Sequence, residues 1–466
     1  MNFTELAFWP RLLAGLLLIT LVRLFIPKVG QAVSRYDRCA LAALSLWLLS
    51  CVGLLTTAIF AAVFTITWAI LLLMFRLPPE RRKWLLWPGL CLLCAPLAYY
   101  KYRVFLMSDV LGLRERAFYE LAIPAGISFY TLQKVGMLID ASKLPHWRPR
   151  FLDYANFASF FPLVVAGPIE RKADLFPQME SFSFQWSWSR LTAGLPWIAL
   201  GFFYKLCLAD NLSAFINKDL MDSAWPILLC TFLFGLKIYF DFCGYSLIAL
   251  GLAKCLGVDL TLNFRSPYWS GSISQFWRRW HISLSYWLRD YVYFPLGGSR
   301  TKRWALNLMA VFVLSGIWHG AGWGFLIWGA LHGFFSVVAH QLKGRVRLPW
   351  LLGWGLTSVC VFLAWLPFYE TRLPILREKA AVLLTPSAYS LSGLTGYLKS
   401  YDSGNLVTLV AAISLCLTAI AFEGLSRLRK KDDYAFAMHP LTIALCIACT
   451  ILLGASEGNE FVYFSF

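Results

Sequence analysis

The stretch Ser315-Gly-Ile-Trp-His319-Gly-Ala-Gly-Trp323 places a histidine about midway along a mostly apolar run from Ala305 to Val338. An ionisable side chain is costly in lipid unless it faces protein or water, so a histidine at this depth indicates a functional site. A second histidine, His281, lies upstream in Gln275-Phe-Trp-Arg-Arg-Trp-His281-Ile-Ser-Leu-Ser285. Together the two histidines predict chemistry inside the bilayer.

The composition is that of a polytopic membrane protein. Of 466 residues, 59% are hydrophobic and only 14% are charged, and the mean hydropathy is +0.62. A membrane helix needs roughly 20 mainly apolar residues, and such segments recur from one end of the chain to the other. We therefore predict an all-α fold with roughly eleven to thirteen membrane helices, plus re-entrant or interfacial helices, around a central tunnel. The apolar segments lie near 8–27, 39–75, 84–107, 117–140, 151–169, 191–217, 226–257, 305–340, 348–369, 405–426 and 436–455.

The organisation of these segments predicts one membrane domain over residues 1–466. It comprises N-terminal helices (1–115), a core that carries the motifs (116–340) and C-terminal helices (341–466). Segments 39–75 and 305–340 are each long enough for a helical hairpin. The N-terminus lacks the basic leader of a secretory signal, so we expect the first apolar run, Leu12 to Phe25, to be retained as a span.

The net charge of +17 would suggest nucleic acid in a soluble protein. Here Lys and Arg cluster in short connections, where the retention of basic loops in the cytoplasm explains them, and we predict no nucleic-acid partner. The N-terminus, the Leu373–Asn405 stretch and the Glu457–Phe466 end are then outside. The clusters assigned to the cytoplasm are Lys28/Arg35/Arg38, Arg76/Arg81/Arg82/Lys83, Arg300/Lys302/Arg303, Lys343/Arg345/Arg347 and Arg427/Arg429/Lys430/Lys431.

Four basic residues do not fit this simple alternation: Lys101, Arg103, Arg114 and Arg116. They predict a re-entrant or interfacial helix nearby. The segment from Asn263 to Arg303 is also too polar to span and is rich in aromatic residues, which suits interfacial helices or backbone buried within the protein. Such a segment could form the floor of a cavity.

The depth of His319 follows from helical geometry. From cytoplasmic Arg303, about 16 residues of helix at about 1.5 Å each place His319 roughly 24 Å deep, past the centre of a hydrocarbon core of about 30 Å. Gly320, Gly322 and Gly324 follow it and would let backbones or a substrate approach closely. We expect His319 to be reached from the membrane interior or from the outer side.

Each of the two histidines has two possible interpretations, one chemical and one structural. A neutral imidazole at His319 can take a proton from a hydroxyl, as a general base in acyl transfer would; the alternative is a packing histidine. Beside His281, the residues Arg278, Arg279 and Trp280 could bind an anionic donor such as coenzyme A or a phosphopantetheine. Arg next to Trp is equally a common pattern for anchoring at an interface.

Other polar residues in apolar runs favour structural roles. Asp241 lies four residues after Lys237 on the same helical face, which predicts a structural ion pair, with a proton relay as the lesser alternative. His332 could share the cavity of His319, although packing is favoured, and His146, His340 and His439 lie in or beside loops. The CxxC pairs Cys91/Cys94 and Cys446/Cys449 lie in apolar helices without nearby polar ligands, so we predict packing residues and no metal site.

Several established motifs are absent from the sequence. It has no Gly-x-Ser-x-Gly elbow, no Gly-x-x-x-x-Gly-Lys phosphate loop and no His-Glu-x-x-His metal motif. Hydrolases, ATP-driven pumps and zinc proteases of those types lose support.

Several longer motifs, in order along most of the chain, resemble the membrane-bound O-acyltransferase family, in the bacterial branch that acetylates alginate and cellulose. The more distant D-alanyl transfer proteins of teichoic acid belong to the same group. The motifs are Ile123-Pro-Ala-Gly-Ile-Ser-Phe-Tyr130, Phe161-Pro-Leu-Val-Val-Ala-Gly-Pro-Ile-Glu-Arg171, Asp241-Phe-Cys-Gly-Tyr-Ser246, Asn263-Phe-Arg-Ser-Pro-Tyr268, Phe276-Trp-Arg-Arg-Trp-His-Ile-Ser-Leu-Ser-Tyr-Trp-Leu-Arg-Asp-Tyr-Val-Tyr-Phe-Pro-Leu-Gly-Gly298 and Gly316-Ile-Trp-His-Gly-Ala-Gly-Trp323.

The resemblance implies a ring of helices with inner and outer openings that meet at His319, the position regarded as catalytic in the family, and a second important position at His281. It implies a multi-pass protein of the bacterial inner membrane that uses acetyl-coenzyme A, or an acetyl group derived from it, and needs no permanently bound cofactor. The expected partners are a periplasmic SGNH-type acetyltransferase with a Ser-His-Asp site, a polysaccharide synthesis and secretion complex, and membrane lipid. The alternatives are D-alanyl transfer to teichoic acid-type polymers, and a non-enzymatic transporter of a lipid-linked or anionic solute.

Overall fold

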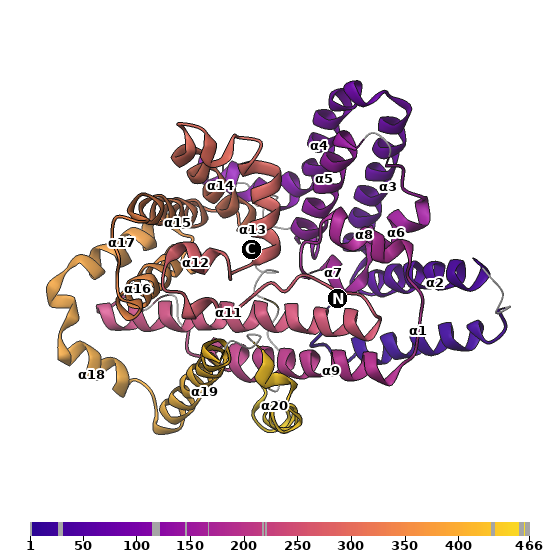
Figure 1. Ribbon diagram of the computed structural model, residues 1–466. Helices are drawn as coiled ribbons and strands as arrows, with labels where there is room; N and C mark the ends of the chain where they lie inside the picture. Colours follow the sequence, from indigo (N-terminus) through magenta and orange to yellow (C-terminus); the bar gives the residue numbers. More distant parts are fainter. Residues whose placement is uncertain are drawn as a thin grey trace. The chain divides into compact units, whose positions relative to one another are not determined.

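A computed structural model of the chain confirms the predicted all-α membrane fold (Figure 1). It describes residues 2–26, 31–113, 122–144, 147–165, 167–216, 219, 221–429, 434–455 and 461, and the regular structure in these ranges is helical. Six helical segments there are long and apolar enough to cross a membrane: Leu54–Arg76 (α3), Trp188–Ser213 (α9 and its continuation), Ala224–Cys255 (α11), Trp323–Leu342 (α15), Trp350–Tyr369 (α16) and Ser403–Leu428 (α19). Two shorter helices, α14 (Trp304–His319) and α20 (Pro440–Leu453), are also apolar.

The predicted total of eleven to thirteen membrane helices stays a prediction, because several apolar segments fold as short or interrupted helices. The segment near 151–169 is the clearest correction. It forms two short helices, α6 (Phe151–Ser159) and α7 (Phe161–Val164), that break at Phe160. Pro162 has no N–H to donate and is suited to the first turn of a new helix, so the chain restarts there.

By its internal contacts the chain divides into two compact units. One comprises residues 1–198 and 245–262, and the other comprises residues 199–244 and 263–462. The long helix α11 contributes residues to both. The single domain expected from the sequence stays a prediction.

In the first unit, α3, α4 (Arg82–Leu97) and α5 (Ile127–Lys143) pack against one another, as Figure 1 shows. Beyond α4 the chain continues in π-helical turns that contain Lys101, which donates a hydrogen bond to Ser128 Oγ at 3.2 Å. This irregular helix lies where the charge pattern predicted a re-entrant or interfacial element. Arg114 and Arg116 of the same prediction lie outside the described residues.

Two ion pairs join α2 (Gln31–Ser50), which carries Arg35 and Arg38 of the N-terminal basic cluster, to neighbouring helices of this unit. Arg23, at the end of α1 (Phe8–Arg23), pairs with Asp37 of α2 at 2.9 Å. Arg38 of α2 pairs with Asp153 of α6 at 2.6 Å. The unit also contains α8 (Lys172–Glu180) and most of α9 (Trp188–Phe202).

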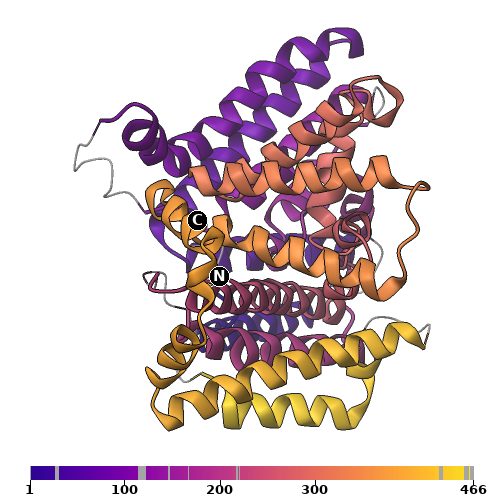
Figure 2. The same ribbon diagram turned by 90° about the vertical axis from the view of Figure 1, so that its left-hand side faces the viewer.

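In the second unit, α14 and α15 form the predicted hairpin and share the most extensive contact of any two described helices. Glycines allow this close approach: a Cβ at Gly329 would lie 2.5 Å from the carbonyl oxygen of Phe312, and one at Gly316 would overlap the carbonyl of Phe325. Small residues at such an interface let backbones pack closely in a membrane. Figure 2 shows α19 and α20, coloured yellow, next to each other, and both line one apolar cavity.

The polar segment 263–303 folds into short helices joined by turns, in agreement with its predicted non-spanning character. It includes α12 (Ile273–Trp277), α13 (Ile282–Leu288) and η7 (Arg289–Tyr293). All of these elements belong to the second unit. His281, within this segment, is buried, and so is His319 at the end of α14.

Candidate functional site

His319 is the last residue of α14 and is 1% exposed. Its ring lies 4.9 Å from that of Trp328, edge to face, and 5.3 Å from that of Phe368. Gly320 ends the helix in an extended conformation with a φ of −167°. The glycines after His319 serve packing of backbone and rings: a Cβ at Gly320 would overlap the ring of Phe325, and one at Gly324 would overlap the carbonyl of Pro367.

His281 lies between α12 and α13 and is also 1% exposed. It has a φ of 45° and a ψ of 55°, a left-handed conformation that residues other than glycine seldom adopt. Backbone outliers of this kind persist only where their surroundings hold them, and they concentrate at functional sites. Its ring packs edge to face on Phe242 at 4.6 Å.

Asn263 holds this turn in place. Its backbone carbonyl accepts a hydrogen bond from the N–H of Ile282 at 2.9 Å. Its side-chain oxygen accepts from the N–H of Ser283 at 3.2 Å and from the Ser283 hydroxyl at 2.7 Å. The first N–H groups of a helix need such partners, so Asn263 fixes the start of α13 and with it the direction of His281. The sequence analysis gave Asn263 no role of its own.

The tertiary structure brings the two histidines together. Their ring centroids are 6.3 Å apart, and both line one cavity of about 210 Å³. The two ring nitrogens of His281 are buried and have no hydrogen-bond partner among the residues that the structure describes. Leaving a buried polar group unsatisfied costs about 1–3 kcal/mol, so this cavity is built to receive a polar group or water.

The basic residues near His281 occupy different positions. Arg278 is exposed and lines the cavity, whereas Arg279 donates a hydrogen bond to the carbonyl of Arg265 at 3.2 Å. Trp280 is 1% exposed and packs on Phe276 at 5.4 Å in the aromatic core, so its ring does not face the cavity. Donor binding by these three residues stays a prediction.

Arg289 lines the same cavity and follows the C-terminal end of α13, and no site role was predicted for it. It is exposed and pairs with Asp290 at 2.7 Å. About two helical turns separate Arg289 from the left-handed residue His281, and periodicity alone did not indicate that both line one cavity. The remaining residues that line the cavity are Trp277, Leu284, Ser285, Leu288, Tyr293, Leu308, Val311, Phe312 and Ser315.

The other described histidines have packing or capping positions. His332 is fully buried, with Trp277 at 4.9 Å and Trp328 at 4.8 Å, and it is not among the residues that line the cavity. His340 packs on Trp304, and His439 Nδ1 accepts a hydrogen bond from the N–H of Leu441. His146 lies outside the described residues.

The buried charge at Asp241 has a partner from another helix that the sequence did not suggest. Asp241 pairs with Lys205 at 2.7 Å, and Lys205 also pairs with Asp210 at 2.7 Å. All three side chains are fully buried, and Lys205 comes from the π-helical turns η5 (Phe203–Ala209). Lys237 lies within electrostatic range of Asp210, and its expected pair with Asp241 stays a prediction. The contact between helices supports the structural interpretation of Asp241.

A second carboxyl in a quoted motif is also buried. Glu170, in the first unit, is 2% exposed and accepts hydrogen bonds from the backbone N–H of Thr261 at 2.5 Å and from its hydroxyl at 3.2 Å. Burial raises the pKa of Glu170 to about 7, against the opposing effect of these hydrogen bonds. These contacts join two loops of that unit, and they give the glutamate near the end of the Phe161–Arg171 motif a structural role.

The cysteines and other acidic or imidazole groups provide no metal centre within the described part of the chain, where no three of them gather closely enough to hold an ion. Cys91 and Cys94 are exposed free thiols, and Cys446 and Cys449 are free as well.

Fold and site together define a helical membrane protein with a small cavity lined by two buried histidines. Residues 113–367 match the model of the MBOAT, membrane-bound O-acyltransferase family. The chain therefore belongs to the membrane-bound O-acyltransferase family, and it is an acyltransferase. The matched region contains both histidines, and the predicted location in the bacterial inner membrane agrees with the family and with the six apolar helical segments.

Named relatives cover most of the chain. It is 30% identical over 438 residues to the peptidoglycan O-acetyltransferase of Helicobacter pylori, covering 83% of each protein. It is 30% identical over 431 residues to the "Probable alginate O-acetylase" of Pseudomonas putida, covering 84% of this chain and 86% of that one. The teichoic acid D-alanyltransferase of Bacillus subtilis is 31% identical over 251 residues, which cover 48% of this chain and 61% of the relative.

Proposed function

We propose that this acyltransferase moves acetyl groups from a cytoplasmic donor across the inner membrane for O-acetylation of an exported polysaccharide. Relatives named for peptidoglycan and alginate acetylation match more than four-fifths of the chain, whereas the teichoic acid relative matches less than half. This difference favours acetyl transfer over the D-alanyl alternative. The expected final acceptor is an alginate-like or cellulose-like polymer.

The observation that carries the proposal is the pair of imidazoles on one small cavity. A volume of about 210 Å³ is below the usual range of about 300–1,000 Å³ for sites that enclose a whole ligand. It suits the acetyl end of a donor and an acceptor hydroxyl, with the rest of each substrate outside. Arg278 at the same cavity supplies positive charge for an anionic donor such as acetyl-coenzyme A, whereas Arg289 is paired with Asp290.

In the proposed reaction, His319 removes the proton from the acceptor hydroxyl. The hydroxyl oxygen then forms a bond to the carbonyl carbon of the acetyl thioester, and the carbon–sulfur bond breaks. The proton held by His319 returns to the leaving thiolate, so the products are an acetyl ester and a free thiol. His281 contacts the reacting groups through its free ring nitrogens and positions the donor.

The acceptor hydroxyl would belong to a serine of a periplasmic SGNH-type partner or to a small carrier. This partner would then pass the acetyl group to the polymer as part of a synthesis and secretion complex. The position of His319, expected past the middle of the bilayer from the length of its helix, supports an acceptor that arrives from the outer side.

The test replaces His319 with Ala in cells that make the acetylated polymer. We expect polymer acetylation to fall by about 10²–10⁴-fold, the usual contribution of a general base, while the protein level is unchanged. His332→Phe is the matched control, because His332 is equally buried among aromatic rings but does not line the cavity. Unchanged acetylation in the His319 variant would contradict the proposal.

A second experiment distinguishes the enzyme from a transporter of a lipid-linked or anionic solute. Purified protein is given radiolabelled acetyl-coenzyme A with a candidate partner, and consumption of the donor is measured. An acetyl transferase consumes donor only when His319 is present. Solute flux that survives the loss of His319, without donor consumption, would favour transport.

A further inference from the structure

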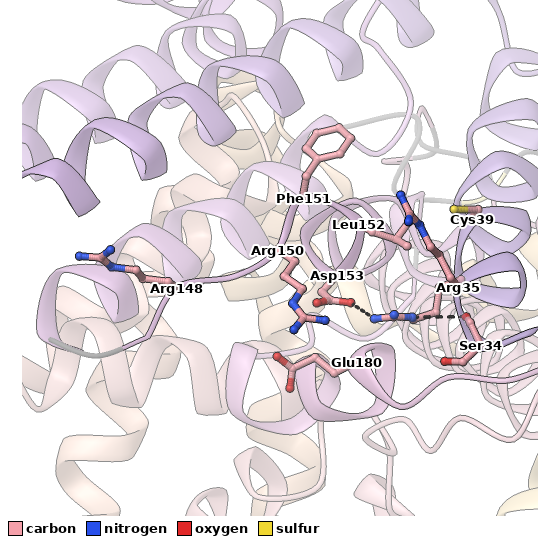
Figure 3. Close-up of a pocket in the computed structure, with 10 residues that line it drawn as sticks. Ser34, Arg35, Cys39, Arg148, Arg150, Phe151, Leu152, Asp153 and Glu180 are labelled. Carbon is pink, nitrogen blue, oxygen red and sulfur yellow. Dashed lines mark hydrogen bonds and ion pairs between the residues drawn. The ribbon is translucent and has the colours of Figure 1, made fainter. Parts of the chain in front are cut away.

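The first unit contains a large charged cavity that is separate from the histidines. Its volume is about 990 Å³, and it lies among α2, α6, the connection before α6 and the end of α8 (Figure 3). The residues that line it are Ser34, Arg35, Arg38, Cys39, Arg148, Arg150, Phe151, Leu152, Asp153 and Glu180. The proposed acetyl transfer gives this cavity no role.

Positive charge is in excess in this cavity. Arg38 is neutralised by Asp153 at 2.6 Å and also donates to the Ser34 carbonyl. The other three arginines, Arg35, Arg148 and Arg150, are exposed and form no ion pair with any described residue. In Figure 3, Arg150 lies beside Glu180, which is the one other carboxylate of the lining. Three unpaired guanidinium groups around one cavity fit an anion, and phosphate oxygens match their geometry well.

An apolar groove adjoins the charged cavity. It has a volume of about 420 Å³ and lies between α1 and α2. Cys39 lines both spaces, so it marks their shared rim. The other residues that line the groove are Gly15, Leu18, Ile19, Val22, Tyr36, Ala40, Ala43, Leu44 and Trp47. A charged cavity that continues into an apolar groove has the two chemistries of a phospholipid.

The dimensions of the groove agree with this occupant. Along α2 it extends from Tyr36 to Trp47, which at about 1.5 Å per residue is roughly 16 Å. That is about half of a hydrocarbon core of about 30 Å, the depth of one leaflet. The charged cavity lies at the basic end of the α1–α2 pair, which the charge pattern assigns to the cytoplasmic surface. A lipid of the inner leaflet would therefore have its headgroup beside the arginines.

We propose that this face of the first unit binds one anionic phospholipid. Its phosphate is held by Arg35, Arg148 and Arg150, its glycerol region passes over Cys39, and an acyl chain lies in the α1–α2 groove. The bound lipid bridges α2 and the start of α6, so it stabilises the packing of these elements. The proposal is independent of the acetyl transfer reaction.

The first test measures lipid retained by the purified full-length protein, by native mass spectrometry. The probes are phosphatidylglycerol and phosphatidylcholine, added in equal amounts. We expect preferential retention of phosphatidylglycerol, and about 100-fold weaker retention in the Arg35→Gln/Arg148→Gln/Arg150→Gln variant, since each basic residue near an anionic lipid contributes about fivefold. Lys343→Gln/Arg345→Gln/Arg347→Gln removes the same charge from exposed positions and should retain the lipid normally.

The second test separates a lipid from a free phosphate compound. Ala43→Trp fills the groove from an exposed position, and Leu17→Trp places the same ring on an exposed part of α1 that does not line the groove. We expect Ala43→Trp alone to weaken phosphatidylglycerol retention, by about tenfold. Inorganic phosphate or glycerol 3-phosphate at millimolar concentration should not displace the lipid.

A third measurement needs no variant. Maleimide labelling of Cys39 should be severalfold slower in phosphatidylglycerol nanodiscs than in phosphatidylcholine nanodiscs, while Cys51, also exposed, reacts equally in both. Equal retention of the two lipids, or equal labelling of Cys39, would overturn the proposal. Displacement of the lipid by free phosphate, or binding of an acidic protein through the three arginines with lipid retention unchanged, would overturn it as well.

Discussion

Two groups of buried polar side chains in the second unit differ in how the protein satisfies them. Lys205 pairs with both Asp210 and Asp241 at 2.7 Å, and all three side chains are fully buried. His281 is equally buried, yet both its ring nitrogens have no partner in the described part of the chain, and its ring lines a cavity shared with His319. Charges that satisfy one another serve the fold, whereas a polar group left unsatisfied at a cavity is available to a ligand.

His332 shows that burial without partners is not sufficient. No described residue forms a hydrogen bond with its ring nitrogens either, but aromatic rings surround it and it does not line the cavity. Access therefore separates a functional histidine from a packing one. The comparison predicts that changes to Lys205, Asp210 or Asp241 mainly lower stability, whereas changes to the cavity histidines His281 and His319 mainly lower turnover.

The largest effect on stability is expected for Lys205→Met. Removing the lysine leaves Asp210 and Asp241 as buried, uncompensated carboxylates, which costs about 3–5 kcal/mol. The triple variant Lys205→Met/Asp210→Asn/Asp241→Asn should recover most of that loss, because no unpaired charge remains. Thermal unfolding in detergent measures both. A Lys205→Met protein as stable as the wild type would contradict the role of these buried ion pairs in stabilising the fold.

His281→Asn should have the opposite pattern. Asparagine tolerates the left-handed backbone at this position, so we expect the free energy of unfolding to change by less than about 1 kcal/mol. Turnover should fall by about 10–100-fold, because the donor is no longer positioned. Donor consumption and thermal unfolding are measured on the same preparation. Loss of stability together with loss of activity would mean that His281 mainly stabilises the fold.

The pH dependence of stability tests the burial of His281 directly. Burial lowers its pKa to about 3, from about 6.5 in the unfolded chain. Between these values the unfolded chain binds a proton that the folded protein does not, so this contribution to stability is complete above pH ~7.5 and is lost as the pH falls. At pH 5 the loss is about 2 kcal/mol.

The measurement compares thermal unfolding at pH 8 and pH 5 for the wild type and His281→Asn. The wild type should lose about 2 kcal/mol more than the variant, because the variant has no imidazole to protonate. An equal loss in both proteins would mean that His281 is hydrated in the folded state and is not a dry, unsatisfied imidazole.

The smallest effect on turnover is expected for Asn263→Leu. Leucine has a similar size but cannot accept the hydrogen bonds from Ser283, so the start of α13 loosens at a cost of about 1 kcal/mol. Turnover should fall by about tenfold through misplacement of His281. Asn263→Asp retains the acceptor oxygen and should recover part of the turnover. Kinetic assays of both variants check this. An equal loss of turnover in both would contradict the role of Asn263 in positioning His281.

Local patterns in the sequence indicated much of the fold and part of the site. Apolar segments, the hairpin around His319 and the non-spanning character of 263–303 depend on hydropathy and length, which neighbouring residues determine. The break at Phe160 and the contact of Asp241 with Lys205 were not predicted. A helix break within an apolar run and a contact between distant helices leave little trace in periodicity. Trp280 likewise lies in the aromatic core, because it packs on rings from distant parts of the chain such as Tyr239 and Trp365.

The sequence by itself determined that the protein is a helical membrane acyltransferase and that His281 and His319 are its conspicuous polar residues. Composition and motif order are properties of the chain, so no coordinates are needed to recognise them. Only the tertiary structure decided that the two imidazoles share one cavity, that Arg289 joins them and that Asn263 orients His281. It also placed three unpaired arginines next to an apolar groove. These facts depend on packing between residues far apart in the chain, which local patterns do not encode.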